Sequence, residues 1–234
     1  MKIKIAFLAV TTLLFAFSIK AQVQKEITVS SFNEVKFEGS AQWILIPAHE
    51  EKVVIESKSK DIFEKIKVVQ SGDLLTISTT EKDKSITKLF KSVIINVYFK
   101  SIESVSLSGV GSVKANEIFK AEKFAATLRG TGSMDLNIKC SDFAGNMFGT
   151  GVLTTVGYAD KAVVRVEGVG TFEGYGFVTT DMDITVSGVG AAKVYTTGNL
   201  MATLNGVGSI KYMGDPKTKN LDTNGLGSIK QKND

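Results

Sequence analysis

Two groups of side chains in this sequence are spaced as catalytic chemistry would need them. Asp181 and Asp183 flank a single residue, so on a strand both carboxylates would share one face, like the paired acids of a polysaccharide lyase or hydrolase. Asp181 falls in the turn before an expected strand, however, where acids commonly serve turns and solubility. His49 precedes Glu50 in a polar turn, where a lone imidazole is typical of a solvated surface. We therefore expect no catalytic residue and a protein that is not an enzyme.

Three lysines, Lys193, Lys211 and Lys230, recur five residues after the first glycine of a Gly-x-Gly unit. If these units stack as neighbouring strands, the ammonium groups line up about 5 Å apart on one outer face. Such a ladder could receive an anionic glycan or an acidic protein surface. The interpretation that we favour is a solvated edge that prevents end-to-end aggregation.

Composition argues against metal and nucleic-acid chemistry. One His and one Cys, Cys140, exclude a His or Cys metal cluster and an intramolecular disulfide, and we expect no metal and no cofactor. Of the 28 basic residues, three lie in the first 21 positions, which leaves 25 against 24 acidic ones. A nearly neutral chain with two arginines lacks the excess of positive charge that binds the phosphates of nucleic acid.

The first 21 residues have the layout of a signal peptide. Lys2 and Lys4 precede the apolar run 5–17, and Ala21 suits a cleavage site. The run is shorter than the roughly 20 residues that span a bilayer as a helix, so we expect no integral membrane span after cleavage. The predicted location is the periplasm, the cell surface or the medium.

Glycine divides the remaining chain at residue 109, since 20 of the 22 glycines lie at or beyond that position. A Gly-x-Gly unit recurs seven times, at intervals of 18 to 21 residues, which is typical of a solenoid. We interpret its glycines as structural, at tight corners that need unusual backbone angles or close approach of neighbouring coils. They are Gly109, Gly111, Gly130, Gly132, Gly149, Gly151, Gly168, Gly170, Gly188, Gly190, Gly206, Gly208, Gly225 and Gly227.

Around each unit, apolar residues keep one parity and polar residues the other, which predicts strands rather than helices. The fold class predicted is all-β, a right-handed parallel β-helix-like solenoid of about seven coils over 109–234. Residues 22–108 predict a β-rich N-terminal cap that closes one end of the solenoid, with a hairpin turn at 71–73 and a short helical turn at 60–65. One continuous domain then covers about 27–234.

The central residues of the seven units align as well. Turned inward, they belong to the core, which we favour. Turned outward, they form a narrow apolar stripe for a partner. They are Val110, Thr131, Thr150, Val169, Val189, Val207 and Leu226.

Segments 32–37, 67–77 and 106–112, with the glycine units that follow, together resemble the bacterial head GIN domain family, whose members carry the label of auto-transporter adhesins. The resemblance covers essentially the whole chain after the signal peptide. It implies an all-β, β-helix-like fold, and it carries over no catalytic or binding residue.

The function that we expect is that of an exported, non-enzymatic binding module at the bacterial cell envelope, adhesin-like, with a surface glycan or an envelope protein as partner. One alternative is a carbohydrate-active enzyme on the same scaffold. Another is a structural envelope protein whose exposed terminal coil pairs with a second copy to form an oligomer.

Overall fold

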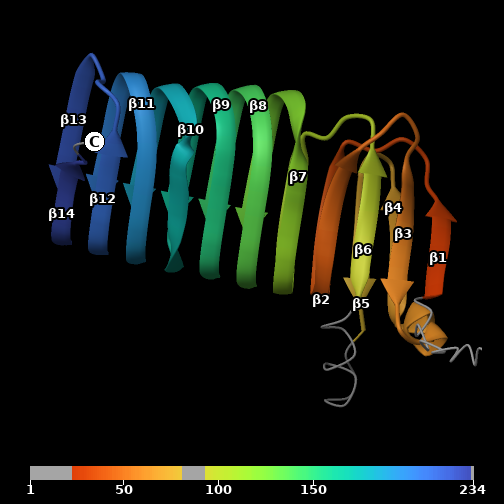
Figure 1. Ribbon diagram of the computed structural model, residues 1–234. Helices are drawn as coiled ribbons and strands as arrows, with labels where there is room; N and C mark the ends of the chain where they lie inside the picture. The colour runs from red at the N-terminus through yellow and green to blue at the C-terminus, as the bar shows by residue number, and fades with distance from the viewer. Residues whose placement is uncertain (1–22, 81–92, 233–234) are drawn as a thin grey trace, which may run out of the picture.

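The computed structural model describes residues 23–80 and 93–232, and the signal peptide expected at 1–21 lies outside this part of the chain. Within it, an N-terminal group of strands closes one end of a regular stack of coils (Figure 1). The predicted class, an all-β parallel solenoid, is confirmed, and its count of about six turns is close to the seven coils predicted. The strands are β1 (Val23–Thr28), β2 (Glu34–Pro47), β3 (Lys52–Ser57), β4 (Ile66–Ser71), β5 (Leu74–Thr79), β6 (Ile94–Phe99), β7 (Ser104–Leu128), β8 (Thr131–Met147), β9 (Thr150–Val166), β10 (Val169–Val186), β11 (Val189–Leu204), β12 (Val207–Met213), β13 (Thr218–Thr223) and β14 (Leu226–Gln231).

Each long strand from β8 to β11 bends once and forms most of one coil. Its first half pairs in parallel with the first halves of its neighbours, and its second half pairs with their second halves. The chain therefore builds two facing walls, joined at the Gly-x-Gly corners. Wall A consists of residues 110–115, 131–136, 150–155, 169–174, 189–194, 207–212 and 226–231, and wall B of residues 123–128, 142–147, 161–166, 181–186, 199–204 and 218–223.

The core lies between the walls and follows the predicted parity. Val113, Met134, Leu153, Phe172, Ala192 and Ile210, each four residues after a first glycine, are fully buried and in register. At the bend opposite the glycine corners, phenylalanine rings fill the interior. The rings of Phe119, Phe124, Phe143 and Phe177 follow one another with centroids 5.0 to 6.3 Å apart.

The corners require glycine because neighbouring coils approach too closely there to leave room for a Cβ. A Cβ at Gly188 would overlap the carbonyl oxygen of Gly168, and a Cβ at Gly168 would overlap that of Gly149. Neither glycine has a positive φ, so at these positions close approach of neighbouring coils, and not backbone angle, excludes a side chain.

The ladder of coils begins earlier in the chain than the glycine count indicates. β2 pairs in parallel with β7, with Gly39 opposite Gly109 and Ala41 opposite Gly111. β3 runs antiparallel to β6 and β1, and β4 and β5 form the expected hairpin, turning at Gly72. A 3-10 helix, η1 (Lys60–Lys65), occupies the predicted helical turn. One continuous core joins both regions, while the limits 22–108 and 109–234 stay a prediction.

Candidate binding surfaces

The lysine ladder lies where the repeat places it, on the outer face of wall A. Lys193 pairs with Lys211 across β11 and β12, and Lys211 pairs with Lys230 across β12 and β14. Lys193 donates to Glu173 over 2.7 Å, and this hydrogen bond raises the pKa of the lysine. Among the described residues, no carboxylate lies within 4 Å of the other two ammonium groups. Two of the three positive charges are therefore available to a ligand.

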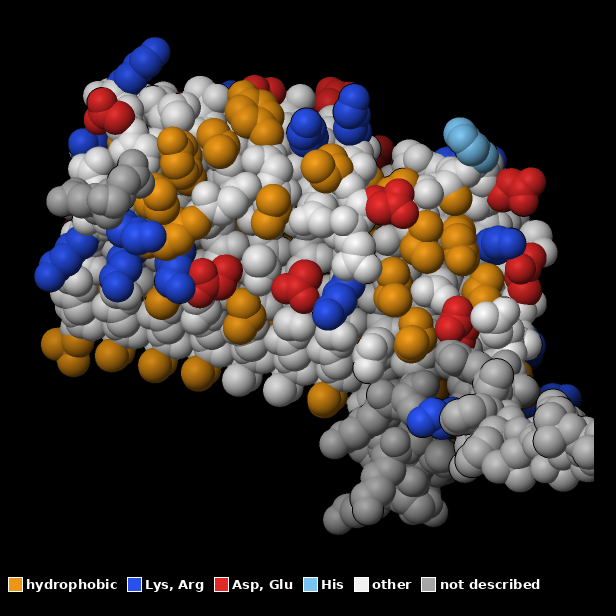
Figure 2. Space-filling view, viewed as in Figure 1, with side chains coloured by type: hydrophobic (Ala, Val, Ile, Leu, Met, Phe, Trp, Pro, Cys, Tyr) orange, Lys and Arg blue, Asp and Glu red, His pale blue; other side chains and the backbone are white. Residues whose placement is uncertain are grey.

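The aligned central residues of the Gly-x-Gly units are exposed, so the expectation that they belong to the core was wrong. Val110, Val169, Val189, Val207 and Leu226 are 47–75% exposed. The reason is that strand alternation continues through the corner: Val189 shares the outward parity of exposed Ser187, while the glycines on either side of it share the parity of the buried residues. We call this row, with Thr131 and Thr150, the corner ridge. Figure 2 shows it as a line of mostly apolar side chains along the lower edge of the molecule.

Wall B carries a trough on its outer face that the sequence did not indicate. Two cavities of about 310 and 440 Å³ adjoin and share Lys161 and Val163. They follow the solenoid axis across the strands, so each coil contributes the same positions. One edge of the trough is the in-register row Lys123, Asp142, Lys161, Asp181, Asn199 and Thr218. The middle row is Ala125, Ala144, Val163, Asp183, Met201 and Asn220.

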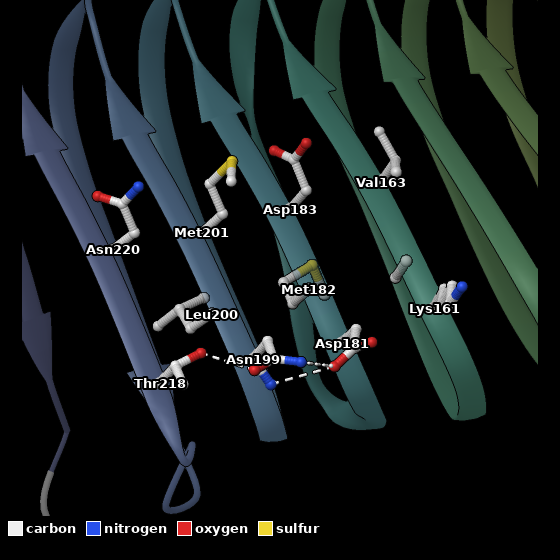
Figure 3. Close-up of a pocket in the computed structure, with 11 residues that line it drawn as sticks. Lys161, Val163, Asp181, Met182, Asp183, Asn199, Leu200, Met201, Thr218 and Asn220 are labelled. Atoms are coloured by element: carbon white, nitrogen blue, oxygen red, sulfur yellow. Dashed lines mark hydrogen bonds between the residues drawn. The ribbon is translucent and has the colours of Figure 1, made fainter.

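The two aspartates considered for catalysis lie in this trough but serve different partners. Asp181 Oδ1 accepts hydrogen bonds from the Asn199 side chain over 2.7 Å and from its backbone N–H over 3.2 Å (Figure 3). The Thr218 hydroxyl donates to Asn199 Oδ1 over 2.6 Å and extends this network to the last coil. Both oxygens of Asp183 accept from the Arg165 guanidinium, at 3.0 Å each. These carboxylates thus organise the surface and do not form a pair.

The remaining reactive side chains are inert or solvated. Burial raises the pKa of the Cys140 thiol to about 12, with smaller contributions from Asp142 and Asp160, so the thiol stays protonated. His49 lies exposed in the bend between β2 and β3. In residues 23–80 and 93–232, no group of three or more His, Cys, Asp or Glu side chains is placed to hold a metal ion. The same ranges contain no helix that is long and apolar enough to cross a membrane.

These walls, corners and surfaces define a parallel β-solenoid that presents long, regular outer faces. The family described as putative auto-transporter adhesin, head GIN domain, matches residues 31–216. The chain belongs to this family, and the family's description supports an adhesin-like role. A search of curated proteins found no match.

Solved structures show the same fold. A putative adhesin from Bacteroides fragilis is 24% identical, with a TM-score of 0.85 over 91% of this chain and 98% of that one. A putative adhesin from Parabacteroides distasonis is 19% identical, with a TM-score of 0.71 over 91% and 97%. A putative lipid binding protein from the same species is also 19% identical, with a TM-score of 0.69 over 91% and 97%.

Proposed function

We propose that this protein is an exported, non-enzymatic binding module of the bacterial cell envelope, and that it holds a linear glycan in the trough of wall B. The observation that carries this proposal is the continuity of the trough. Two cavities that share Lys161 and Val163 run in line across the strands, and a chain-like ligand would contact successive coils in the same way.

The chemistry of the trough suits a hydroxyl-rich chain. Its edge alternates donors and acceptors, with the ammonium group of Lys161 between the carboxylates of Asp142 and Asp181. Sugar hydroxyls both donate and accept, so they can satisfy either kind of group, while Glu34 and Glu103 at the N-terminal end of the trough add negative charge that disfavours an anionic polymer. In the middle row, the exposed side chains of Val163 and Met201 offer apolar surface to the carbon faces of the sugar rings.

A binding role is favoured over hydrolysis by the partners of the two aspartates. Asp183 is held by Arg165, and Asp181 is hydrogen-bonded to Asn199. A glycosidase places two carboxylates on opposite sides of a scissile bond, one as acid and the other as base or nucleophile. Here both carboxylates are used to orient neighbouring side chains instead.

A glycan array combined with a pull-down from an envelope fraction tests the proposal. Val163 faces outward where the cavities meet, so Val163→Trp fills the trough without entering the core. The matched control is Val152→Trp, which places the same bulk on an exposed position of wall A. We expect the wild type and the control to capture a common glycan, and Val163→Trp to bind it at least tenfold more weakly.

Three outcomes would overturn the proposal. Turnover of the captured glycan would make the protein an enzyme. Equal capture by wild type and Val163→Trp would remove the trough from the site. Capture of an envelope protein and of no glycan would show that the ligand class is wrong. Cell fractionation tests the envelope location separately, and a cytoplasmic pool alone would contradict it.

A further inference from the structure

The corner ridge is an unusual surface for a folded protein, because apolar side chains protrude from it in single file. In the last four coils Val169, Val189, Val207 and Leu226 follow one another in register, each strongly exposed. Isolated surface valines are normal, whereas a continuous apolar patch on a protein surface is often functional.

Apolar surface also continues where the ridge contains threonine. Phe148 and Val152 lie on either side of Thr150, and both are exposed. The Arg129 guanidinium lies over the Phe148 ring, 4.6 Å from its centroid. An aromatic ring beside a cation and aliphatic side chains is the combination found where proteins meet the interface of a membrane.

The shape of the ridge does not suit a protein partner. The seven residues of the ridge are separated by six steps of about 4.8 Å, which makes the ridge about 29 Å long, and the walls that meet at it pack roughly 10 Å apart. The ridge therefore offers about 300 Å², against the roughly 800 Å² that each partner buries in a stable protein complex. It is also convex, and a convex edge buries little against another rigid surface. A deformable surface can close around it from both sides.

The charges beside the ridge indicate which deformable surface this is. Lys193, Lys211 and Lys230 stand four residues beyond the ridge on wall A, about 13 Å away at the rise of a strand. The headgroup layer of a bilayer is about 5–8 Å deep, and interfacial segments enter some 5–10 Å beyond it. When the ridge lies at that greater depth, the lysines lie at the level of the headgroups.

Acidic groups near these coils do not cancel the lysine ladder. Glu173 neutralises Lys193 at one end of it and leaves Lys211 and Lys230. Glu167 and Asp222 lie on the other side of the ridge, toward wall B, where Asp222 accepts a hydrogen bond from Asn224. The wall A flank of the last coils thus presents positive charge to headgroups.

We propose that the corner ridge is a membrane-contact edge: its valines and Leu226 enter the outer part of an anionic lipid bilayer, while Lys211 and Lys230 meet the headgroups. In this pose the solenoid axis lies parallel to the membrane and both walls stand upright on it. The trough of wall B stays open to ligand, so this inference does not depend on the proposed function.

Co-sedimentation with phosphatidylglycerol–phosphatidylethanolamine vesicles tests the contact. The test variant is Val189→Asp/Val207→Asp, and the matched control is Val69→Asp/Leu221→Asp, which introduces the same charge at exposed apolar positions away from both the ridge and the trough. Side chains at all four positions lie outside the core, so we expect both variants to fold, and thermal melting checks this. We expect the wild type and the control to bind the vesicles, and the ridge variant to bind at least tenfold more weakly.

Two further measurements separate insertion from simple charge attraction. Lys211→Glu/Lys230→Glu should weaken binding to these vesicles and lower its salt dependence. An environment-sensitive fluorophore on Val207→Cys should shift to the blue with vesicles, since Cys140 is buried and escapes labelling. The inference fails if the wild type ignores the vesicles, if the ridge variant binds as well as the wild type, or if the fluorophore stays in water. Glycan capture by the ridge variant reports on the trough alone.

Discussion

Replacing Gly188 by alanine adds one methyl group at a corner where two coils touch. The Cβ would overlap the carbonyl oxygen of Gly168 and lie 2.8 Å from the carbonyl oxygen of Glu167. The Gly168 carbonyl accepts a hydrogen bond from Val189 N–H over 3.1 Å, and Gly188 accepts one from Val207 N–H over 3.0 Å. The coils must move apart at the corner, and these bonds must lengthen or break.

The expected cost follows from those two effects. Overpacking a well-packed site costs about 1–3 kcal/mol, and each lost hydrogen bond contributes about 1 kcal/mol. The φ of Gly188 is not positive, so backbone strain adds nothing. We expect Gly188→Ala to lower the free energy of unfolding by about 3–5 kcal/mol, and Gly188→Val by more. At a site with room, glycine to alanine usually stabilises a protein by about 0.4–1 kcal/mol.

Urea denaturation followed by circular dichroism measures this loss, and hydrogen exchange locates it, since a solenoid can open coil by coil. Two control variants separate the effect of close approach between coils from the effect of an unfavourable backbone angle. At Gly176 a Cβ meets only the Val156 side chain, at 3.2 Å, and Gly176→Ala should be nearly neutral. Gly72 has free space but a φ of +57°, so Gly72→Ala should cost about 1–2 kcal/mol through strain. Wild-type stability in Gly188→Ala would refute the close-approach account of the corners.

Two other predictions follow from the thiol and from the open end of the solenoid. Burial raises the pKa of Cys140 to about 12 against an ordinary 9.0, so the thiol of the unfolded chain ionises first as pH rises. The thiol's contribution to stability is therefore present below pH 9 and is lost toward pH 12. The urea midpoints of wild type and Cys140→Ala should converge over this pH range, and midpoints that stay equally far apart would contradict the shift. In the last coil, Lys219 of β13 lies in register with buried Leu200, and its ammonium group is 5.9 Å from the Tyr212 ring centroid. A charged side chain at this position of an end strand disfavours pairing with another copy of the chain. We expect a monomer by light scattering at micromolar concentration and concentration-dependent association of Lys219→Leu, and a self-associating wild type would show that the edge is open.

The sequence predicts the walls well because strand parity is a local property. Positions such as Val113 and Ile210 alternate with polar neighbours, and only an inward direction satisfies both. The corner ridge was expected in the core because Val189 is apolar and lies between two glycines, which were assumed to interrupt the alternation. The alternation in fact continues through the corner, and Val189 has the outward parity of Ser187.

Two further features depended on the pairing of strands away from the Gly-x-Gly units, which the spacing of those units does not give. The trough arises because Lys161 and Asp181, twenty positions apart, become neighbours on adjacent coils, with a bulge that makes up the difference in coil length. The start of the ladder at β2 was hidden because its corner reads Gly39-Ser40-Ala41. Ala41 replaces the second glycine there and remains buried.

The in-register stack of coils also sets how such a protein can change its reach. Duplication of one repeat of about 19 residues would add a coil whose contacts copy those already present, so the core and corners would need no redesign. Each added coil would extend the trough by about 4.8 Å and give the ridge one more residue. The number of repeats therefore sets the length of the trough and of the ridge. Selection can change this length by whole coils without altering the contacts in the rest of the molecule.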